Sequence, residues 1–546
     1  MTNRKTITTL RDKNQTKKSR SRGRNRRLLL EQLEDRRLLA TYALQSEVFA
    51  QTAPGGPLTG ATGDGFGCFV TLSDDGGVVI VGAPEADGGK GAAYAYQRND
   101  NGTPADQTDD SWGFFASISA PDGAAGDNFG ASIAVSEAML VIGAPGVDVA
   151  ATDQGAVYVF DTQNGFAMTK LTLSSPQTGD RFGATVAATN SGTRIAAGAP
   201  LFDGPGADRG GVFVFENSGA GWSAPVALTA PVSEDGAQFG AAVALDGNSA
   251  VVGAPLEDSG GADRGSAYLF TYDPDTTTWS AGTPLVPGAS VTLNAGDRYG
   301  AAVEVDQGFI VVGSPGAPGT GVGGAHVFAD MGGGLGHVYS PDVGPSGLNL
   351  PGGANYGAAV AAVGGAQPRA AVGAPGIDAG GGANQGGVHV FGMGMADEFF
   401  AGSPAGDRFG SALAMLGNTL VVGAPLRDNG ATVDTGGVAI YGPTTPPQPM
   451  DFGDAKSSYG TRLNDDGPRH VVGALYLGAS IDAEMDATET WDASGDDFTG
   501  IDDEDGVTLP GGASFDGALL VIGDTATVDV TLSQPGRIDA WLDLNA

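Results

Sequence analysis

The sequence predicts an all-β protein, a seven-bladed β-propeller followed by a small β-sandwich-like domain. An aromatic-glycine pair recurs seven times, at spacings of 63, 53, 57, 60, 57 and 53 residues. Each pair leads through a short apolar stretch to Gly-Ala-Pro or Gly-Ser-Pro, and no helical periodicity interrupts the series. A unit of this length holds about four strands, and radial closure of such units protects their exposed edges.

The same repeat accounts for an unusual composition. Glycine makes up 92 of the 546 residues, more than twice its usual share of about 7%. Because these glycines recur with a period, they indicate order rather than low-complexity disorder. The aromatic-glycine pairs are Phe66-Gly67, Phe129-Gly130, Phe182-Gly183, Phe239-Gly240, Tyr299-Gly300, Tyr356-Gly357 and Phe409-Gly410, and the second halves start at Gly82, Gly143, Gly198, Gly253, Gly313, Gly373 and Gly423.

The fourth repeat shows the strands that each unit should contain. Residues 239–245 alternate bulky and small side chains, as in a strand between closely packed neighbours. Residues 250–252 are typical of a buried strand, which Pro255 ends because proline cannot donate to a ladder. The third strand is predicted at residues 266–270, and the fourth near Ser290 to Leu293.

The two ends of the repeat region are predicted to close the ring. The seventh unit meets Pro446 and Pro447 after its third strand and lacks a fourth. The segment from Leu44 to Pro54 precedes the first pair and resembles an orphan fourth strand. Pairing of the two segments would close the propeller without a covalent bond.

Charge separates the chain into a basic start and an acidic body. Residues 1–37 hold 13 of the 28 basic residues and 4 of the 63 acidic ones. The remainder therefore has 15 basic against 59 acidic residues, a balance of −44. This body would be repelled by nucleic acid and by anionic lipid, and cation binding is the natural alternative. No run of 18 apolar residues predicts a membrane span, and Cys68 is the only cysteine.

These residues together resemble the FG-GAP repeats of integrin α-chain propellers and their bacterial relatives, over about residues 41–442. The resemblance implies a closed propeller. The family often carries calcium in a D-x-D-x-D-G loop between the two halves of the repeat. No repeat here has that pattern: the first has Asp74-Asp75-Gly76 and the fourth Asp246-Gly247-Asn248, which are interpreted as turns.

Acidic residues recur at two other places in the repeats. One set lies two residues before the aromatic and is expected to stabilise the turn into the first strand: Asp64, Asp127, Asp180, Asp297 and Asp407. The other follows the second halves: Asp203, Asp208, Glu257, Asp258, Asp263, Asp428 and Asp434. If those loops share one rim, they form either an acidic ring for a cationic or hydroxylated ligand or simply solvated loops. His326 and His389 stand where other repeats have Tyr or Phe and are interpreted as packing residues.

The C-terminal part differs from the repeats. Residues 443–450 indicate a stiff Pro/Thr linker. Residues 451–546, with Asp451-Phe452-Gly453-Asp454-Ala455 and Gly495-Asp496-Asp497-Phe498, resemble the GEVED domain of bacterial extracellular proteins. The chain stops in what resembles a strand, so this domain is expected to be incomplete.

A calcium site is predicted in this C-terminal domain. Between Asp482 and Asp505 lie 11 acidic residues and no basic one. Such a concentration of like charge indicates either a solvated loop or a counter-ion, and oxygen ligands suit Ca²⁺. The candidate ligands are Asp496, Asp497, Asp502, Asp503, Glu504 and Asp505.

The N-terminus bears on export. Residues 1–40 are predicted to be a disordered basic segment, in which Leu33 to Leu39 resembles the LEPRxLL motif of bacterial surface or secreted proteins, with Asp35 in place of proline. The resemblances together imply a non-enzymatic extracellular or cell-surface protein of the binding or adhesion type, with a protein or carbohydrate ligand. No nucleophile elbow, metal-protease or phosphate-loop motif is present, so no catalytic residue is named.

Two other classes of function stay open. One is a hydrolase or lyase that acts on polysaccharide at the propeller mouth, and the other is a structural envelope protein. Carboxylates converging beside aromatics in the central channel would favour the enzyme, whereas a channel lined by glycine and alanine would disfavour it.

Overall fold

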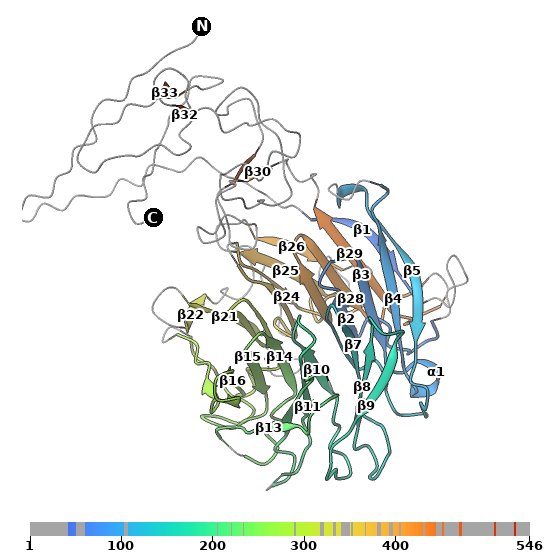
Figure 1. The fold of residues 1–546 in the computed structure, drawn as a ribbon, viewed down its shortest axis with the longest axis vertical. Helices are drawn as coiled ribbons and strands as arrows, with labels where there is room; N and C mark the ends of the chain where they lie inside the picture. Colours follow the sequence, from blue (N-terminus) through green and yellow to red (C-terminus); the bar gives the residue numbers. More distant parts are fainter. Residues whose placement is uncertain are drawn as a thin grey trace, which may run out of the picture. The chain divides into compact units, whose positions relative to one another are not determined.

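The seven predicted units form the blades of a β-propeller in a computed structural model (Figure 1). The chain divides into two compact units, Arg37–Pro446 and a second made of Met1–Arg36 with Pro447–Ala546. The structure describes residues 42–50, 60–102, 107–204, 206–219, 221–232, 234–288, 291–316, 322–330, 335–339, 350, 353–365, 367–378, 384–392, 397–402, 406–429, 432–443, 450–452, 469–471, 507–508 and 529–530.

Each blade is an antiparallel sheet, and in blades 1 to 6 its strands follow one another in chain order. Blade 1 consists of β2 (Phe69–Leu72), β3 (Val78–Ala83), β4 (Ala92–Asn99) and β5 (Ser111–Ile118). Blade 2 consists of β6 (Ser132–Val135), β7 (Met139–Ala144), β8 (Ala156–Asp161) and β9 (Ala167–Leu171). Blade 3 consists of β10 (Thr185–Ala188), β11 (Arg194–Ala199), β12 (Gly211–Glu216) and β13 (Val226–Leu228).

The remaining blades follow the same plan. Blade 4 consists of β14 (Ala242–Asp246), β15 (Ser249–Ala254), β16 (Ser266–Asp273), β17 (Thr278–Trp279) and β18 (Thr283–Pro284). Blade 5 consists of β19 (Ala302–Asp306), β20 (Phe309–Ser314), β21 (Gly324–Asp330) and β22 (Leu335–Tyr339). Blade 6 consists of β23 (Ala359–Val363), β24 (Arg369–Gly373), β25 (Gly387–Gly392) and β26 (Glu398–Ala401). Blade 7 consists of β27 (Ala412–Leu416), β28 (Thr419–Ala424), β29 (Gly437–Pro443) and β1 (Tyr42–Val48).

Few other elements are described. The single turns α1 (Ala86–Gly89) and η1 (Gln107–Asp109) lie in blade 1. In the other unit, β30 (Met450–Phe452) pairs with β31 (Arg469–Val471), and β32 (Val507–Thr508) pairs with β33 (Asp529–Val530). None of the helices in the described part of the chain is long and apolar enough to cross a membrane.

Strand β1 closes the ring, as the sequence predicts. It pairs antiparallel with β29, from Tyr42 opposite Pro443 to Val48 opposite Val438. In Figure 1 the blue β1 lies against the orange β29, although they come from opposite ends of the propeller sequence. The ladder gives blade 7 its missing fourth strand, so the outer edge of β29 is covered.

The fourth strand of blade 4 is not where the sequence predicts it. The prediction near Ser290 is wrong, because β17 and β18 both pair with β16 directly after the third strand. The carboxylate of Asp273 caps the intervening turn by accepting the N–H of Asp275 at 2.9 Å. The ring of Trp279 then packs on that of Tyr272 at 5.4 Å. These local contacts bring the nearer segment into the sheet.

The core lies in seven seams between adjacent blades rather than in one central mass. At each seam the glycine that begins a second half lies against the carbonyl of the next blade's aromatic-glycine pair. A Cβ on Gly253 would stand 1.9 Å from the oxygen of Gly300. The same approach, at 2.0–2.1 Å, recurs at Gly82, Gly143, Gly198, Gly313, Gly373 and Gly423.

The glycine of each aromatic-glycine pair is required for a second reason. Gly300 has φ +89°, donates its N–H to the oxygen of Gly313 in its own blade at 2.9 Å, and turns its carbonyl toward the preceding blade. An L-residue rarely adopts this backbone conformation. The ring of the preceding aromatic is buried against its own third strand, as with Phe239 and Tyr268. The repeat motif therefore encodes the contact between blades.

Candidate functional site

The propeller encloses a central channel whose cavity measures about 420 Å³. The first strands of all seven blades line it, mainly with alanine, valine and leucine side chains. Phe69 is the one aromatic residue of this lining, and Asp74, Asp246, Glu304 and Asp306 are its acidic residues. We call the end of the channel where the first strands begin the FG face. The loops between second and third strands open on this face, because the strands are antiparallel.

Two of the channel carboxylates join neighbouring blades. The carboxylate of Asp246 in blade 4 accepts the N–H of Gln307 in blade 5 at 2.7 Å. That of Asp306 accepts the N–H of Gly364 in blade 6 at 2.8 Å. These bonds tie the turns at the end of the channel opposite the FG face, so the two acids have a structural role.

Glu304 is the exceptional residue of the channel. The corresponding position holds Thr71 in blade 1 and alanine in the other five blades: Ala134, Ala187, Ala244, Ala361 and Ala414. Burial raises the pKa of Glu304 to about 7, and the nearby charges of Asp306 and Asp246 add to the effect. Its Oε1 accepts the N–H of Val305 at 3.1 Å. The sequence contained the signal for this residue, a carboxylate where the repeat has a small side chain.

On the FG face, the loops between second and third strands share an internal cap in blades 2, 3, 4, 6 and 7. In blade 4 the Oδ1 of Asp258 accepts the N–H of Asp263 at 2.8 Å, and Asp263 has φ +50°. The same bond recurs at Asp148–Asp153, Asp203–Asp208, Asp378–Asn384 and Asp428–Asp434. The acids predicted at this rim therefore do share one face, and the first acid of each pair folds its loop. Sequence analysis missed Asp148 and Asp378, although they stand at the same offset after Gly-Ala-Pro.

Glu257 is buried rather than displayed on this face. Its side chain is 1% exposed, and its two oxygens accept hydrogen bonds from Tyr268 at 2.6 Å and Ser266 at 2.8 Å. Asp153, Asp208 and Asp263, at the left-handed position, are exposed, and so are the capping acids Asp148, Asp258, Asp378 and Asp428. The FG face thus presents acidic groups on loops that are closed by their own hydrogen bonds.

Four of the five acids that precede the aromatic have the predicted turn role. Asp64 accepts the N–H of Ala61 at 2.6 Å, Asp127 that of Ala124 at 2.8 Å, and Asp180 that of Gln177 at 2.6 Å. Asp297 accepts the N–H of Asn294 at 2.5 Å. Asp407 is 2% exposed, and burial raises its pKa to about 6. The positive charge of Arg427 partly offsets this increase. Each bond spans three residues and fixes the turn into the first strand.

The two repeat histidines are packing residues, as predicted. His389 is fully buried, and its Nδ1 shares a hydrogen bond of 2.7 Å with the hydroxyl of Tyr356. The imidazole of His326 lies against the ring of Tyr299 at 5.2 Å, and burial lowers its pKa to about 4. In both repeats a neutral, buried imidazole packs at the position where other repeats have Tyr or Phe.

The predicted calcium ligands, Asp496, Asp497, Asp502, Asp503, Glu504 and Asp505, lie outside the described residues. In the part of the chain that the structure does describe, no group of three or more His, Cys, Asp or Glu side chains is placed to hold a metal ion.

Comparison with known proteins addresses the repeat directly. The family described as FG-GAP repeat matches residues 57–96, 112–160, 167–215, 222–270 and 402–441. The chain carries FG-GAP repeats. Blades 5 and 6 lie outside these matches, yet they show the same FG-GAP contacts, at Gly313 with Gly357 and at Gly373 with Gly410.

Other comparisons add little to the FG-GAP assignment. No curated protein matches the chain. Among solved structures, the chain is similar to the crystal structure of the RRP9 WD40 repeats at 10% identity and a TM-score of 0.43. That alignment covers 74% of this chain and 98% of the other.

Proposed function

We propose that this FG-GAP propeller is a binding module that presents its FG face to a protein or carbohydrate ligand outside the cell. The observation that carries the proposal is the set of loops on that face in blades 2, 3, 4, 6 and 7, each closed by its own Asp cap. Loops fixed in this way lose little conformational entropy on binding, which favours affinity. Binding residues commonly lie on loops that a rigid scaffold positions.

The charge of the FG face favours particular ligands. Asp153, Asp208 and Asp263 present exposed carboxylates there, within a strongly acidic body. Carboxylates accept hydrogen bonds from hydroxyl groups and attract basic side chains. A polyhydroxylated carbohydrate or a basic protein surface therefore suits this face. An adhesion-type role at an extracellular or cell-surface location agrees with these features and with the LEPRxLL-like and GEVED-like segments.

The channel supports this proposal over the hydrolase or lyase alternative. Its lining is mainly aliphatic, and two of its four acidic residues, Asp246 and Asp306, bond backbone amides of the next blade. A pair of carboxylates that flank a glycosidic bond would have to be free for proton transfer and nucleophilic attack. A structural envelope role makes no use of the acidic loops on the FG face.

A glycan array and a protein-binding screen with the full chain test the proposal. We expect the triple variant Asp153→Asn, Asp208→Asn, Asp263→Asn to lose at least tenfold in affinity for whatever ligand is captured. Asparagine tolerates the left-handed backbone, and blade 6 already has Asn384 in the corresponding bond, at 2.7 Å. The variant should therefore fold normally.

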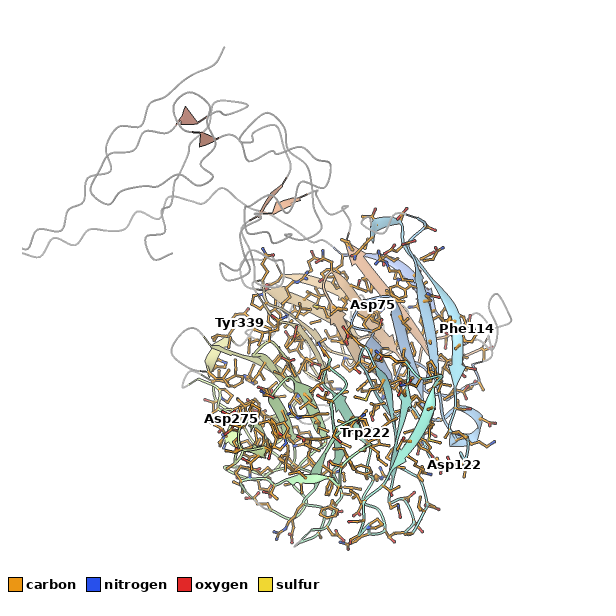
Figure 2. The ribbon with its side chains drawn as sticks, viewed as in Figure 1. Asp75, Phe114, Asp122, Trp222, Asp275 and Tyr339 are labelled. Carbon is orange, nitrogen blue, oxygen red and sulfur yellow. The ribbon has the colours of Figure 1, made fainter. Side chains whose placement is uncertain are left out.

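The matched control is Asp275→Asn. Asp275, which is labelled in Figure 2, lies in a turn of blade 4 at the end opposite the FG face. This variant should keep full affinity. Equal affinity of the triple variant and the wild type would place the ligand elsewhere on the molecule, and the proposal for the FG face would fail.

For the C-terminal segment we propose that Ca²⁺ binds to Asp496, Asp497, Asp502, Asp503, Glu504 and Asp505. The support is the local excess of acid in the sequence, for which oxygen-preferring Ca²⁺ is a suitable counter-ion. Calorimetry of the full chain should show an unfolding transition whose midpoint temperature rises with Ca²⁺ and falls with EDTA. The double variant Asp502→Asn, Asp503→Asn should lose this response. A melt that Ca²⁺ leaves unchanged would contradict the site.

A further inference from the structure

The central channel contains a carboxylate that takes no part in joining the blades. Glu304 lies in β19 of blade 5, is partly exposed, and lines the cavity of about 420 Å³. Its Oε1 accepts the N–H of the adjacent Val305 at 3.1 Å. Among the described residues, no Lys, Arg or His nitrogen lies within 4.0 Å of this carboxylate. Glu304 therefore presents its charge to the cavity and not to a cationic side chain.

The other acids of the channel are bound to the protein. Asp246 and Asp306 accept backbone N–H groups of the next blade at 2.7 and 2.8 Å. Asp74 does the same in blade 1, since its carboxylate accepts the backbone N–H of Glu137 in blade 2. These three acids lie at or just after the end of a first strand, whereas Glu304 lies in the middle of one.

The surroundings of Glu304 are aliphatic side chains and strand edges. The strands β14, β15, β20 and β23 pack against β19, and Asp246 is the only titratable side chain within those four strands. Each first strand is also the end strand of its sheet, so its outer edge has backbone carbonyls that the sheet leaves unpaired. The channel therefore combines one available carboxylate with an aliphatic wall and backbone acceptors.

We propose that the central channel binds a small organic cation, a primary ammonium group on a short aliphatic chain, with Glu304 as its anchor. An ammonium group has three donors, of which one would bind Glu304 and the others carbonyls of the strand edges. The chain would lie along the alanine, valine and leucine side chains, where burial of apolar surface is favourable.

Other small ligands suit the channel less well. An anion would be repelled by the charges of Asp246 and Asp306. Ca²⁺ takes roughly six to eight oxygen ligands. Within the described part of the chain, no group of three or more His, Cys, Asp or Glu side chains is placed to hold a metal ion.

The ionisation of Glu304 gives the site a pH dependence. Burial raises the pKa of Glu304 to about 7, and the charges of Asp306 and Asp246 add to this increase. Cys68, which also lines the channel, stays neutral near this pH because burial raises its pKa to about 11. An alkylammonium stays protonated up to about pH 10. Its affinity should be about tenfold higher at pH 8 than at pH 6, because the ionised fraction of Glu304 rises by that factor.

The test is isothermal titration calorimetry of the full chain with butylammonium chloride, and with butanol as a neutral probe of similar shape. We expect saturable binding of butylammonium at one site per chain and much weaker binding of butanol. Glu304→Ala should bind butylammonium about tenfold more weakly or worse, and should lose the pH dependence. Five other blades have alanine at this position, so the variant should fold, which an unchanged circular dichroism spectrum would show.

The matched control is the triple variant Asp153→Asn, Asp208→Asn, Asp263→Asn, which removes negative charge from the FG face and leaves the channel lining intact. It should bind butylammonium as the wild type does, whatever happens to its affinity for a ligand of the FG face. A wild type without saturable binding would overturn the proposal. Equal affinity of Glu304→Ala and the wild type, or equal binding of butanol and butylammonium, would also overturn it, because the carboxylate would then not be the anchor.

Discussion

Replacing Gly253 with alanine is expected to destabilise the propeller by about 3 kcal/mol or more, since one added methyl group must displace backbone. The new Cβ would stand 1.9 Å from the oxygen of Gly300 and 2.8 Å from its carbonyl carbon. Both belong to the main chain of the next blade, which cannot move away as a flexible side chain could. Urea unfolding of the variant and the wild type measures the loss as a shift in midpoint.

The effect isolates the contact between blades because Gly253 has no special backbone conformation. It is a strand residue of β15 whose φ is not positive, so alanine itself would be tolerated there. Gly113→Ala in β5 is the matched control, with no atom within 4 Å of its added Cβ. The control should change stability by less than about 0.5 kcal/mol. If both variants lost the same stability, close packing of the blades would not be the reason for the glycine.

Deleting residues 41–54 is the second change with a large expected effect, about 5 kcal/mol. It removes β1 and with it the buried side chains of Tyr42, Val48 and Ala50, at about 1.5–3 kcal/mol for each large one. It also exposes the edge of β29, which had been paired from Val438 to Pro443. A large fall in melting temperature, with increased self-association, is the expected result.

Strand β1 matters to more than its own blade. The Arg427 guanidinium of blade 7 pairs with Glu47 at 2.7 Å. In blade 1, the N–H of Trp112 donates to the hydroxyl of Ser46 at 3.2 Å. In blade 6, Arg369 contacts Tyr42. Removing β1 therefore loosens three adjacent blades. Deletion of residues 1–36, which belong to the other unit, is the control and should leave the melting of the propeller unchanged. An unchanged melt on loss of 41–54 would argue against closure by β1.

Prediction from sequence succeeded wherever the repeat supplied several copies of one pattern. The aromatic-glycine pairs, the turn role of Asp64 and its counterparts, and the packing role of His326 could all be inferred by comparing positions between repeats. It failed for the fourth strand of blade 4, where no repeat motif marks the strand. There the hairpin capped by Asp273 and the contact of Trp279 with Tyr272 decide the pairing.

The candidate sites show the same division. The acidic loops of the FG face could be located from sequence, but their common cap could not. The bond from Asp263 to Asp258 depends on a left-handed backbone at Asp263, which few non-glycine residues adopt and which no sequence motif marks. Glu304 could have been noticed as a carboxylate where the other repeats have a small side chain, but its raised pKa could not be inferred. That shift comes from burial and from the neighbouring Asp306 and Asp246, which only the assembled blades provide.

The sequence by itself determined the number of blades, their order and the ends that meet, because period and motif are properties of the chain. Only the tertiary structure decided why the glycines are needed, since Gly253 and Gly300 belong to different blades. It also showed which carboxylates fold the protein. Such roles depend on distances between residues far apart in sequence, and these distances are set when the ring closes.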